Sequence, residues 1–243
     1  MEIRFIGSGD AFGSGGRLQP CMIVTDQASR YALDCGLTAL IGLRQQEIAP
    51  NTIDAVLITH LHGDHCGGVP FLLMDAMLGS KRESPLTIIG PVGIEAHIKM
   101  LQEALFPGSS IMQPKFKVEY FEITPDSPIQ FRELRITAIN ARHTATTLPL
   151  ALKIETKKNT IAYTGDGELT EGLIDFTAGA DLLITECYYF DKPVKWHLNY
   201  PDIKHLKAGK TVLTHMHENM LTHIDEVPEL CAYDGMEITI DCQ

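Results

Sequence analysis

The sequence is poor in the features that mark secreted, disulfide-linked or membrane proteins. Its first residues, 1–7, read directly as a strand and contain no apolar signal-peptide core. Its apolar runs are far shorter than the about 20 residues that a membrane-spanning helix needs. No cysteine pair has Cys-x-x-Cys spacing, so we expect free thiols and a cytoplasmic protein. The six cysteines are Cys21, Cys35, Cys66, Cys187, Cys231 and Cys242.

Basic side chains are also in short supply. Lys and Arg number 20 against 31 Asp and Glu, which gives a formal net charge of −11. A nucleic-acid-binding protein usually carries a basic surface, so an extended nucleic acid is an unfavourable partner for this chain. The excess of acidic over basic residues favours a small or compact substrate. Bound divalent metals would add local positive charge that this formal count ignores.

The sequence predicts one domain over residues 1–243, because no linker, low-complexity tract or short repeat divides the chain. Hairpins with interspersed helices are typical of a mixed sheet system that has helices packed outside. Strands are predicted at 2–7, 22–25, 30–34, 56–59, 86–89, 116–121, 134–140, 148–155, 160–163, 182–185, 211–214 and 236–240. Helices are predicted at 37–47, 69–78 and 92–106.

The densest chemical signal is the segment from Thr59 to His65, which reads Thr-His-Leu-His-Gly-Asp-His. It follows the apolar run 54–58, which predicts a buried strand. A strand that ends in three imidazoles and a carboxylate delivers nitrogen and oxygen donors to one point at the edge of a sheet. Such donors suit zinc, and also manganese or iron.

Three further strands end in candidate ligands. They lead to His143, to Asp166 within Thr-Gly-Asp, and to His215 within Leu-Thr-His. Each places a donor where a loop leaves a rigid scaffold, which is the usual position of functional residues. The glycine-rich loop at 7–16 has no Lys-Ser/Thr ending and no clean Gly-x-Gly-x-x-Gly, so it does not indicate nucleotide binding.

In this order, the motifs resemble the metallo-β-lactamase superfamily over nearly the whole chain. The resemblance implies an α/β (α+β) fold, a four-layer αβ/βα sandwich with the metals at one edge. It also implies that two divalent ions, Zn²⁺ in the first instance with Mn²⁺ or Fe²⁺ as alternatives, are bound by seven side chains. His60, His62 and His143 would bind the first ion, Asp64, His65 and His215 the second, and Asp166 would bridge them.

This arrangement makes chemical sense without the family. Two cations about 3.5–4 Å apart need a shared anionic ligand, and they lower the pKa of a bound water to near neutrality. Hydroxide is then available at working pH, and the ions hold the substrate oxygens as a Lewis-acid clamp.

Glu186 and His197 resemble the phosphodiesterase branch of the superfamily, which includes ribonuclease Z and a cyclic ribose phosphodiesterase. In that branch an acidic residue follows a strand here, and a histidine lies downstream. The resemblance implies that His197 assists the phosphate or its leaving oxygen and that Glu186 orients it. Thr144 and Thr147 also fit the branch; their hydroxyls could contact a phosphate, or they could be ordinary β-branched strand residues.

The predicted activity is therefore a phosphodiesterase acting on a cyclic nucleotide, a cyclic ribose phosphate or a short oligonucleotide. Ribonuclease Z carries a long arm that grips tRNA, and the stretch 143–166 has no room for one. A tRNA 3′-processing endoribonuclease is thus an alternative, as is a thioester or lactone hydrolase on the same fold. An iron redox protein of the flavodiiron type is a third alternative.

Relatives often dimerise, so a homodimer is an expected possibility. Cys66 is interpreted as a packing residue.

Overall fold

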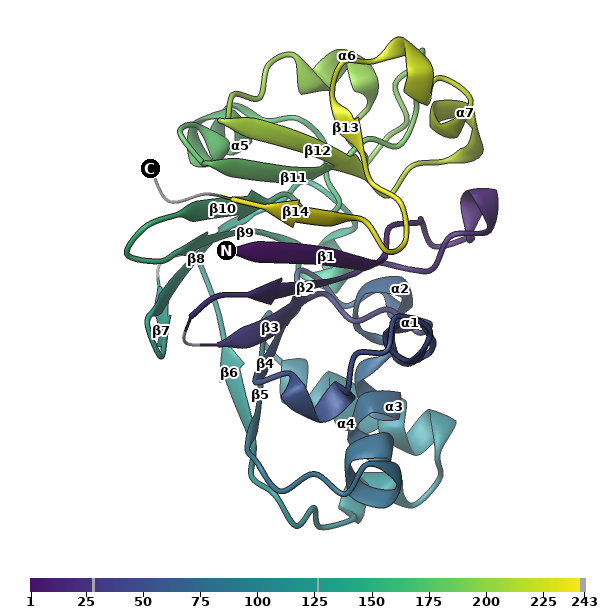
Figure 1. Ribbon diagram of the computed structural model, residues 1–243, viewed down its shortest axis with the longest axis vertical. Coiled ribbons are helices and arrows are strands. Elements are labelled where there is room, and N and C mark those ends of the chain that lie inside the picture. The colour runs from purple at the N-terminus through teal and green to yellow at the C-terminus, as the bar shows by residue number, and fades with distance from the viewer. Residues whose placement is uncertain (28, 126, 241–243) are drawn as a thin grey trace.

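The computed structural model describes residues 1–27, 29–125 and 127–240, and these form two facing seven-stranded sheets. The first sheet has the order β14-β1-β2-β3-β4-β5-β6 and the second β13-β12-β11-β10-β9-β8-β7. Figure 1 shows the last strand, in yellow, beside the first, in purple. The first sheet contains β1 (Glu2–Gly7), β2 (Cys21–Thr25), β3 (Arg30–Leu33), β4 (Ala55–Leu57), β5 (Leu86–Gly90), β6 (Val118–Glu122) and β14 (Glu237–Thr239).

The second sheet begins at an antiparallel meander and continues as parallel strands. β8 pairs antiparallel with β7 and β9, whereas β11 is parallel to both β10 and β12. Its strands are β7 (Ile129–Phe131), β8 (Leu134–Asn140), β9 (Leu150–Glu155), β10 (Thr160–Tyr163), β11 (Leu182–Glu186), β12 (Lys210–Thr214) and β13 (Leu230–Cys231).

The main core lies between the two sheets. Alternate residues of each strand point into it, as the two-residue period of a strand requires. Phe5 and Leu57 from the first sheet and Leu152 and Ile154 from the second belong to one buried cluster. Their neighbours in sequence, such as Ile6 and Ala151, pack outward against helices, so the strands are apolar on both faces.

Helices cover both outer faces, which gives the four layers predicted from the sequence. The helices α1 (Ala39–Gln45), α3 (Val69–Met74) and α4 (Ile94–Leu105) share a buried cluster with the first sheet, and α5 (Glu171–Thr177) packs on the second. In Figure 1 the first group lies below and to the right of its sheet, with α5 to α7 above. None of the described helices is long and apolar enough for a membrane crossing.

The predicted α/β sandwich is confirmed, and most element predictions agree with it within a few residues. The strands at 134–140 and 160–163 have the predicted bounds. The helix predicted at 69–78 changes character, because the α-helix ends at Met74 and a π-helical turn, Asp75–Gly79, follows. The sequence patterns missed β7, α5 and β13, and also the short helices at 63–66, 200–203 and 218–221. These segments are short, and short segments give little periodicity to detect.

The short helices α2 (Gly63–Cys66), α6 (Tyr200–Ile203) and α7 (Glu218–Leu221) lie in loops that follow strands of the two sheets. Cys66 in α2 is fully buried in the outer cluster of the first sheet, and burial raises the pKa of its thiol to about 12. Its predicted role in packing agrees with this position. The five cysteines among the described residues are free thiols, and Cys242 lies outside those residues.

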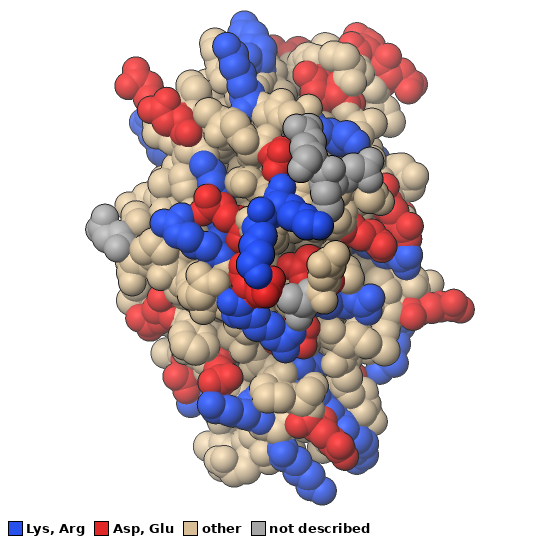
Figure 2. All heavy atoms as spheres, turned by 60° about the vertical axis from the view of Figure 1, so that its left-hand side comes forward, with Lys and Arg blue, Asp and Glu red and all other residues tan. Residues whose placement is uncertain are grey.

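Charged residues of both signs are mixed on the face drawn in Figure 2, where Lys and Arg stand beside Asp and Glu. Exposed ion pairs such as Arg135 with Glu155 and Lys157 with Glu133 fit this pattern. Exposed pairs of this kind contribute about 0–1 kcal/mol each. Stability must therefore come mainly from the core between the sheets.

We expect Ile136→Ala to lower the free energy of unfolding by about 2–5 kcal/mol, because it empties a fully buried position in β8. The matched control is Ile41→Ala in α1, where the isoleucine is 55% exposed and the change should be within about 0.5 kcal/mol. Urea unfolding monitored by circular dichroism measures both. Equal losses in the two variants would contradict this location of the core.

Candidate metal centre

The loops that leave the carboxyl ends of the central strands meet at one edge of the sandwich. The segment after β4 carries His60 and His62 and then enters α2, where Asp64 and His65 lie. His143 follows β8, Asp166 follows β10 and His215 follows β12 directly. The structure therefore brings together all seven side chains that the sequence predicted as metal ligands, and groups them in two clusters.

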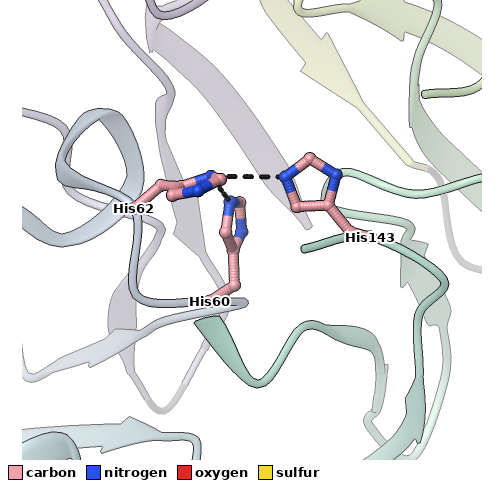
Figure 3. A group of neighbouring side chains, drawn as sticks. All are labelled: His60, His62 and His143. Carbon is pink, nitrogen blue, oxygen red and sulfur yellow. Dashed lines mark hydrogen bonds between the residues drawn. The ribbon is translucent and has the colours of Figure 1, made fainter. Parts of the chain in front are cut away.

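Three histidines form the first cluster. Nε2 of His60 and Nε2 of His143 lie 3.0 and 3.2 Å from Nδ1 of His62. Figure 3 shows the three rings pointing toward one another. Burial, reinforced by neighbouring imidazoles, lowers the pKa of each of the three, so their neutral forms are favoured. Neutral imidazoles whose nitrogens converge can direct their lone pairs to one common point. Ligands around a cation are arranged in this way.

Asp64, His65, Asp166 and His215 form the second cluster, and all four are buried. Nε2 of His65 lies 3.3 Å from a carboxylate oxygen of Asp64 and 3.3 Å from one of Asp166. Nε2 of His215 lies 3.3 Å from the same Asp64 oxygen. The two clusters adjoin, because the ring centroids of His60 and His65 are 4.1 Å apart.

The second cluster requires positive charge. Among the described residues, Nε2 of His65 and Oδ1 of Asp166 are buried and make no hydrogen bond, although they lie 3.3 Å apart. Burial disfavours a charged His215, yet Asp166 and Asp64 raise its pKa to about 9. A cation between these groups would satisfy both the orphaned atoms and the carboxylate charge. The donor set of nitrogen and oxygen therefore fits a divalent metal.

The backbone turns that present these donors explain some of the local sequence. Gly165 has a φ of +56°, and a Cβ there would lie 2.9 Å from Cβ of Thr59, so only glycine fits before Asp166. His215 itself has a φ of +54°, which is rare for a residue with a side chain. Its backbone N–H donates to the carbonyl of Ser8, which ties this turn to the first loop.

Asp34 was missed by the sequence reasoning, although it follows β3 in the same way that the ligands follow their strands. It is fully buried, and its carboxylate accepts hydrogen bonds from Nδ1 of His65 at 2.7 Å and from the hydroxyl of Tyr163 at 2.8 Å. It also accepts from the backbone and hydroxyl of Thr59. By holding Nδ1–H of His65, Asp34 leaves Nε2 free to face the second cluster.

Glu186 and His197 adjoin the second cluster. Nδ1 of His197 donates to Oε2 of Glu186 at 2.7 Å, and the other carboxylate oxygen accepts from the backbone N–H groups of Gly167 and Leu198. Burial disfavours the charged imidazole, but Glu186 and Asp166 raise the pKa of His197 above its ordinary value. Tyr188, also missed from sequence, stacks on His197 with ring centroids 4.4 Å apart. Glu186 thereby fixes the protonated Nδ1 of His197, and the raised pKa favours the imidazolium, which can donate the proton on Nε2.

A pocket of about 150 Å³ opens over these groups. It is lined by Ala11, Phe12, His62, Asp64, His143, Asp166, Tyr188, His197 and His215. Neither Thr144 nor Thr147 lines it. They belong to a 3₁₀ turn and not to a strand, and the buried Thr147 hydroxyl donates to the carbonyl of Thr144. Their contact with substrate therefore stays a prediction.

The remaining histidines lie away from the donor clusters. His217 caps α7 by accepting a hydrogen bond from the backbone of Asn219 and stacks on Tyr189. His97 lies within α4, and His205 is exposed after α6.

The fold and the two donor clusters define a metal-dependent hydrolase of the metallo-β-lactamase fold. The metallo-β-lactamase fold protein YhfI from Bacillus subtilis superposes with a TM-score of 0.79 at 23% identity, over 98% of this chain and 99% of that one. The short form of human tRNase Z gives 0.80 at 24% identity, over 99% and 100%. The chain belongs to the family described as "Anti-Pycsar protein Apyc1", whose sequence model matches residues 1–230.

Curated relatives point to the same class. The chain is 28% identical to the probable metallo-hydrolase YhfI of Bacillus subtilis, in an alignment that covers 80% of this chain and 81% of that protein. It is 27% identical to ribonuclease Z of Lachnoclostridium phytofermentans over 59% of this chain, but this alignment spans only 45% of the ribonuclease.

We expect Asp34→Ala to weaken zinc binding by about 10- to 100-fold, since His65 loses the partner that orients its ring. Tyr163→Phe is the matched control, because it removes one hydrogen bond to Asp34 and keeps the carboxylate. Competition with a chromophoric chelator measures the affinity. Unchanged affinity in a folded Asp34→Ala protein would show that His65 needs no such support.

Proposed function

We propose that the chain is a dinuclear metal-dependent phosphodiesterase that hydrolyses a small phosphodiester, such as a cyclic nucleotide, a cyclic ribose phosphate or a short oligonucleotide. The observation that carries this proposal is the hydrogen-bonded pair of His197 and Glu186 beside the donor clusters. A hydrolase needs a proton donor for the leaving oxygen in addition to its metals, and this pair supplies one. A neighbour described as a diphosphatase from the PhnP family superposes with a TM-score of 0.77 at 16% identity.

The proposed ligands are those described above. His60, His62 and His143 would hold one ion, Asp64, His65 and His215 the other, and Asp166 would be shared. When bound, two Zn²⁺ ions would lower the pKa of a water molecule and neutralise the phosphoryl oxygens; Mn²⁺ and Fe²⁺ are alternatives with the same donors.

The side chains then have separate roles in one displacement. Asp64 orients the attacking water, whose oxygen forms the new bond to phosphorus. The attacking water releases one proton to solvent, and the bond from phosphorus to the leaving oxygen breaks. The imidazolium form of His197 transfers the proton on Nε2 to that oxygen. Glu186 keeps Nδ1 of His197 protonated and directed, so that Nε2 faces the pocket. The products are a phosphomonoester and an alcohol.

A small substrate is supported by the length of the connections around the site. Between His143 and Asp166, all residues of which are described, the chain forms a 3₁₀ turn, β9 and β10. The turn at 156–159 is closed by hydrogen bonds within itself. This stretch contains no arm that could grip a long RNA. The ribonuclease Z relatives favour endoribonuclease activity as the second candidate.

A second copy of the chain is also a proposed partner. Met100 and Leu105 of α4 and Ile111 just beyond it are 57%, 41% and 79% exposed, and such apolar side chains gain from being covered. Light scattering at micromolar concentration tests whether the protein is a dimer.

We expect His197→Ala to reduce turnover of 2′,3′- and 3′,5′-cyclic nucleotides by about 10²- to 10⁴-fold, because the basic ribose oxygen loses its proton donor. Turnover of bis-p-nitrophenyl phosphate should fall much less, because p-nitrophenolate leaves without being protonated. Metal content, measured by plasma emission spectroscopy, should be unchanged. Protein reconstituted with zinc and with manganese is assayed in parallel, and a chelator should stop both reactions. Turnover of thioesters or lactones without any phosphodiester turnover would move the chain to the alternative hydrolases.

Replacing a proposed ligand should have a larger effect. Asp64→Ala and His60→Ala are each expected to abolish turnover, since each removes a donor from a buried cluster. His205→Ala is the matched control, because this histidine is exposed and lies away from the pocket. Wild-type activity in Asp64→Ala with its metals still bound would refute the proposed mechanism.

A further inference from the structure

The loop between β11 and α6, residues 187–199, carries the proposed proton donor His197. It consists of turns, bends and irregular backbone, and all of its residues are described. A loop of this length has no ladder of backbone hydrogen bonds to hold it, so it depends on contacts with its surroundings for a single conformation. The contacts that place His197 therefore belong to the site, although they lie outside the set of proposed ligands.

Trp196, the residue before His197, is held by its backbone. Its N–H donates to Oε1 of Glu168 at 2.8 Å, and its carbonyl accepts a hydrogen bond from Nδ1 of His143 at 2.7 Å. Figure 3 shows this nitrogen on the side of the His143 ring that faces away from His62. One residue of the loop thus connects a carboxylate to a proposed metal ligand.

The conformation of Trp196 shows that its backbone is under strain. Its φ is +69°, a region that residues with side chains disfavour. Its side chain is 44% exposed, so packing of the indole gives it limited support. A disfavoured backbone conformation persists only where surrounding contacts impose it. The hydrogen bonds of the Trp196 N–H and carbonyl are contacts of that kind.

Glu168 is fixed in turn by the segment that carries His143. Its backbone N–H donates to the carbonyl of Arg142 at 3.0 Å, and these two residues form an isolated antiparallel bridge. Its Oε2 lies 3.0 Å from Nε of Arg142, which precedes His143 in the chain. Glu168 therefore uses one carboxylate oxygen for Arg142 and the other for Trp196.

These contacts close a circuit around the proposed proton donor. It runs from His143 to Trp196 and on to Glu168 through hydrogen bonds. It returns from Glu168 to His143 through Arg142. The ring centroid of His197 lies 5.2 Å from that of His143. Without the bond to Glu168, the Trp196 backbone would relax toward a favoured φ, which would turn its carbonyl away from His143 and displace His197.

We propose that Glu168 is a positioning residue, which holds the backbone of Trp196 and thereby sets both the ring of His143 and the place of His197. This inference rests on the proposed function, which makes His143 a metal ligand and His197 the proton donor. It adds a residue that belongs to neither donor cluster and lies outside the lining of the pocket over the ligands.

Trp196 is the only tryptophan in the sequence, so the tryptophan fluorescence of the protein reports on this residue alone. Glu168→Ala removes the acceptor of its N–H and should increase quenching by acrylamide and lower the fluorescence anisotropy. Glu168→Gln keeps a carbonyl oxygen for this N–H and should leave both values close to those of the wild type. Glu168→Asp keeps the charge but is one methylene shorter, so it should behave like the alanine variant.

Turnover by protein saturated with zinc measures the effect on His197. Glu168→Ala should lower kcat for 2′,3′-cyclic nucleotides about 10- to 100-fold, because a misplaced proton donor no longer reaches the leaving oxygen. The fall should be smaller for bis-p-nitrophenyl phosphate, whose leaving group needs no proton. Glu168→Gln should restore most of the activity. The matched control is Glu133→Ala, which removes an exposed glutamate paired with Lys157 and should change neither rate.

Zinc affinity measures the effect on His143. Competition with a chromophoric chelator should show a loss of about tenfold in Glu168→Ala, because the ring loses its fixed acceptor, and little loss in Glu168→Gln. Both readings are made on protein that circular dichroism shows to be folded.

Unchanged quenching and anisotropy in both Glu168→Ala and Glu168→Asp would overturn the inference. So would equal losses in Glu168→Gln and Glu168→Ala, because the ion pair with Arg142 and not the bond to Trp196 would then matter. Equal falls in turnover of the two substrates would show that His197 is not placed in this way. If the wild type hydrolysed no phosphodiester, the proposed function would fail, whereas fluorescence and zinc affinity would still decide whether Glu168 holds Trp196 and His143.

Discussion

The burial of like-charged donors at one sheet edge is the constraint on which the rest of this structure depends. Asp34, Asp64, Asp166 and Glu186 are all buried in the same region. Removing carboxylates from water is costly unless positive charge or hydrogen bonds compensate. Backbone N–H groups and imidazoles supply part of the compensation, and divalent cations fit the remainder. The large apolar core between the two sheets holds the strands that carry these groups together.

The donors fall into two kinds, and the difference has a physical origin. The neutral imidazoles of His60, His62 and His143 face one another, whereas His65 and His215 face carboxylates. The orienting partners follow the same division. A backbone carbonyl fixes His143, a carboxylate fixes His65, and a second carboxylate fixes His197. Each of these three imidazoles is thereby left with Nε2 as its one defined remaining nitrogen, which is a requirement for both metal binding and proton transfer.

The fold explains why so many functional groups meet at one edge. In each half of the sandwich, parallel neighbours such as β3 and β4, or β11 and β12, release their loops on the same side. Residues far apart in sequence, such as Ser8 and His215, are then joined by a backbone hydrogen bond. His143 lines both the pocket over the ligands and a neighbouring cavity of about 420 Å³, because the β8–β9 connection borders both of them.

The sequence by itself indicated a mixed sheet system with outer helices and a set of candidate ligands, because apolar strands that end in His and Asp are visible in a local window. The four-layer sandwich followed from the resemblance of these motifs to a known superfamily. The sequence determined neither Asp34 nor Tyr188, whose partners His65 and His197 are 31 and 9 positions away and come into contact only in the folded chain. It also left Thr144 and Thr147 open, since only the folded turn shows that the Thr147 hydroxyl donates to the carbonyl of Thr144. Local patterns encode burial and chemistry, whereas tertiary packing decides which buried groups become neighbours.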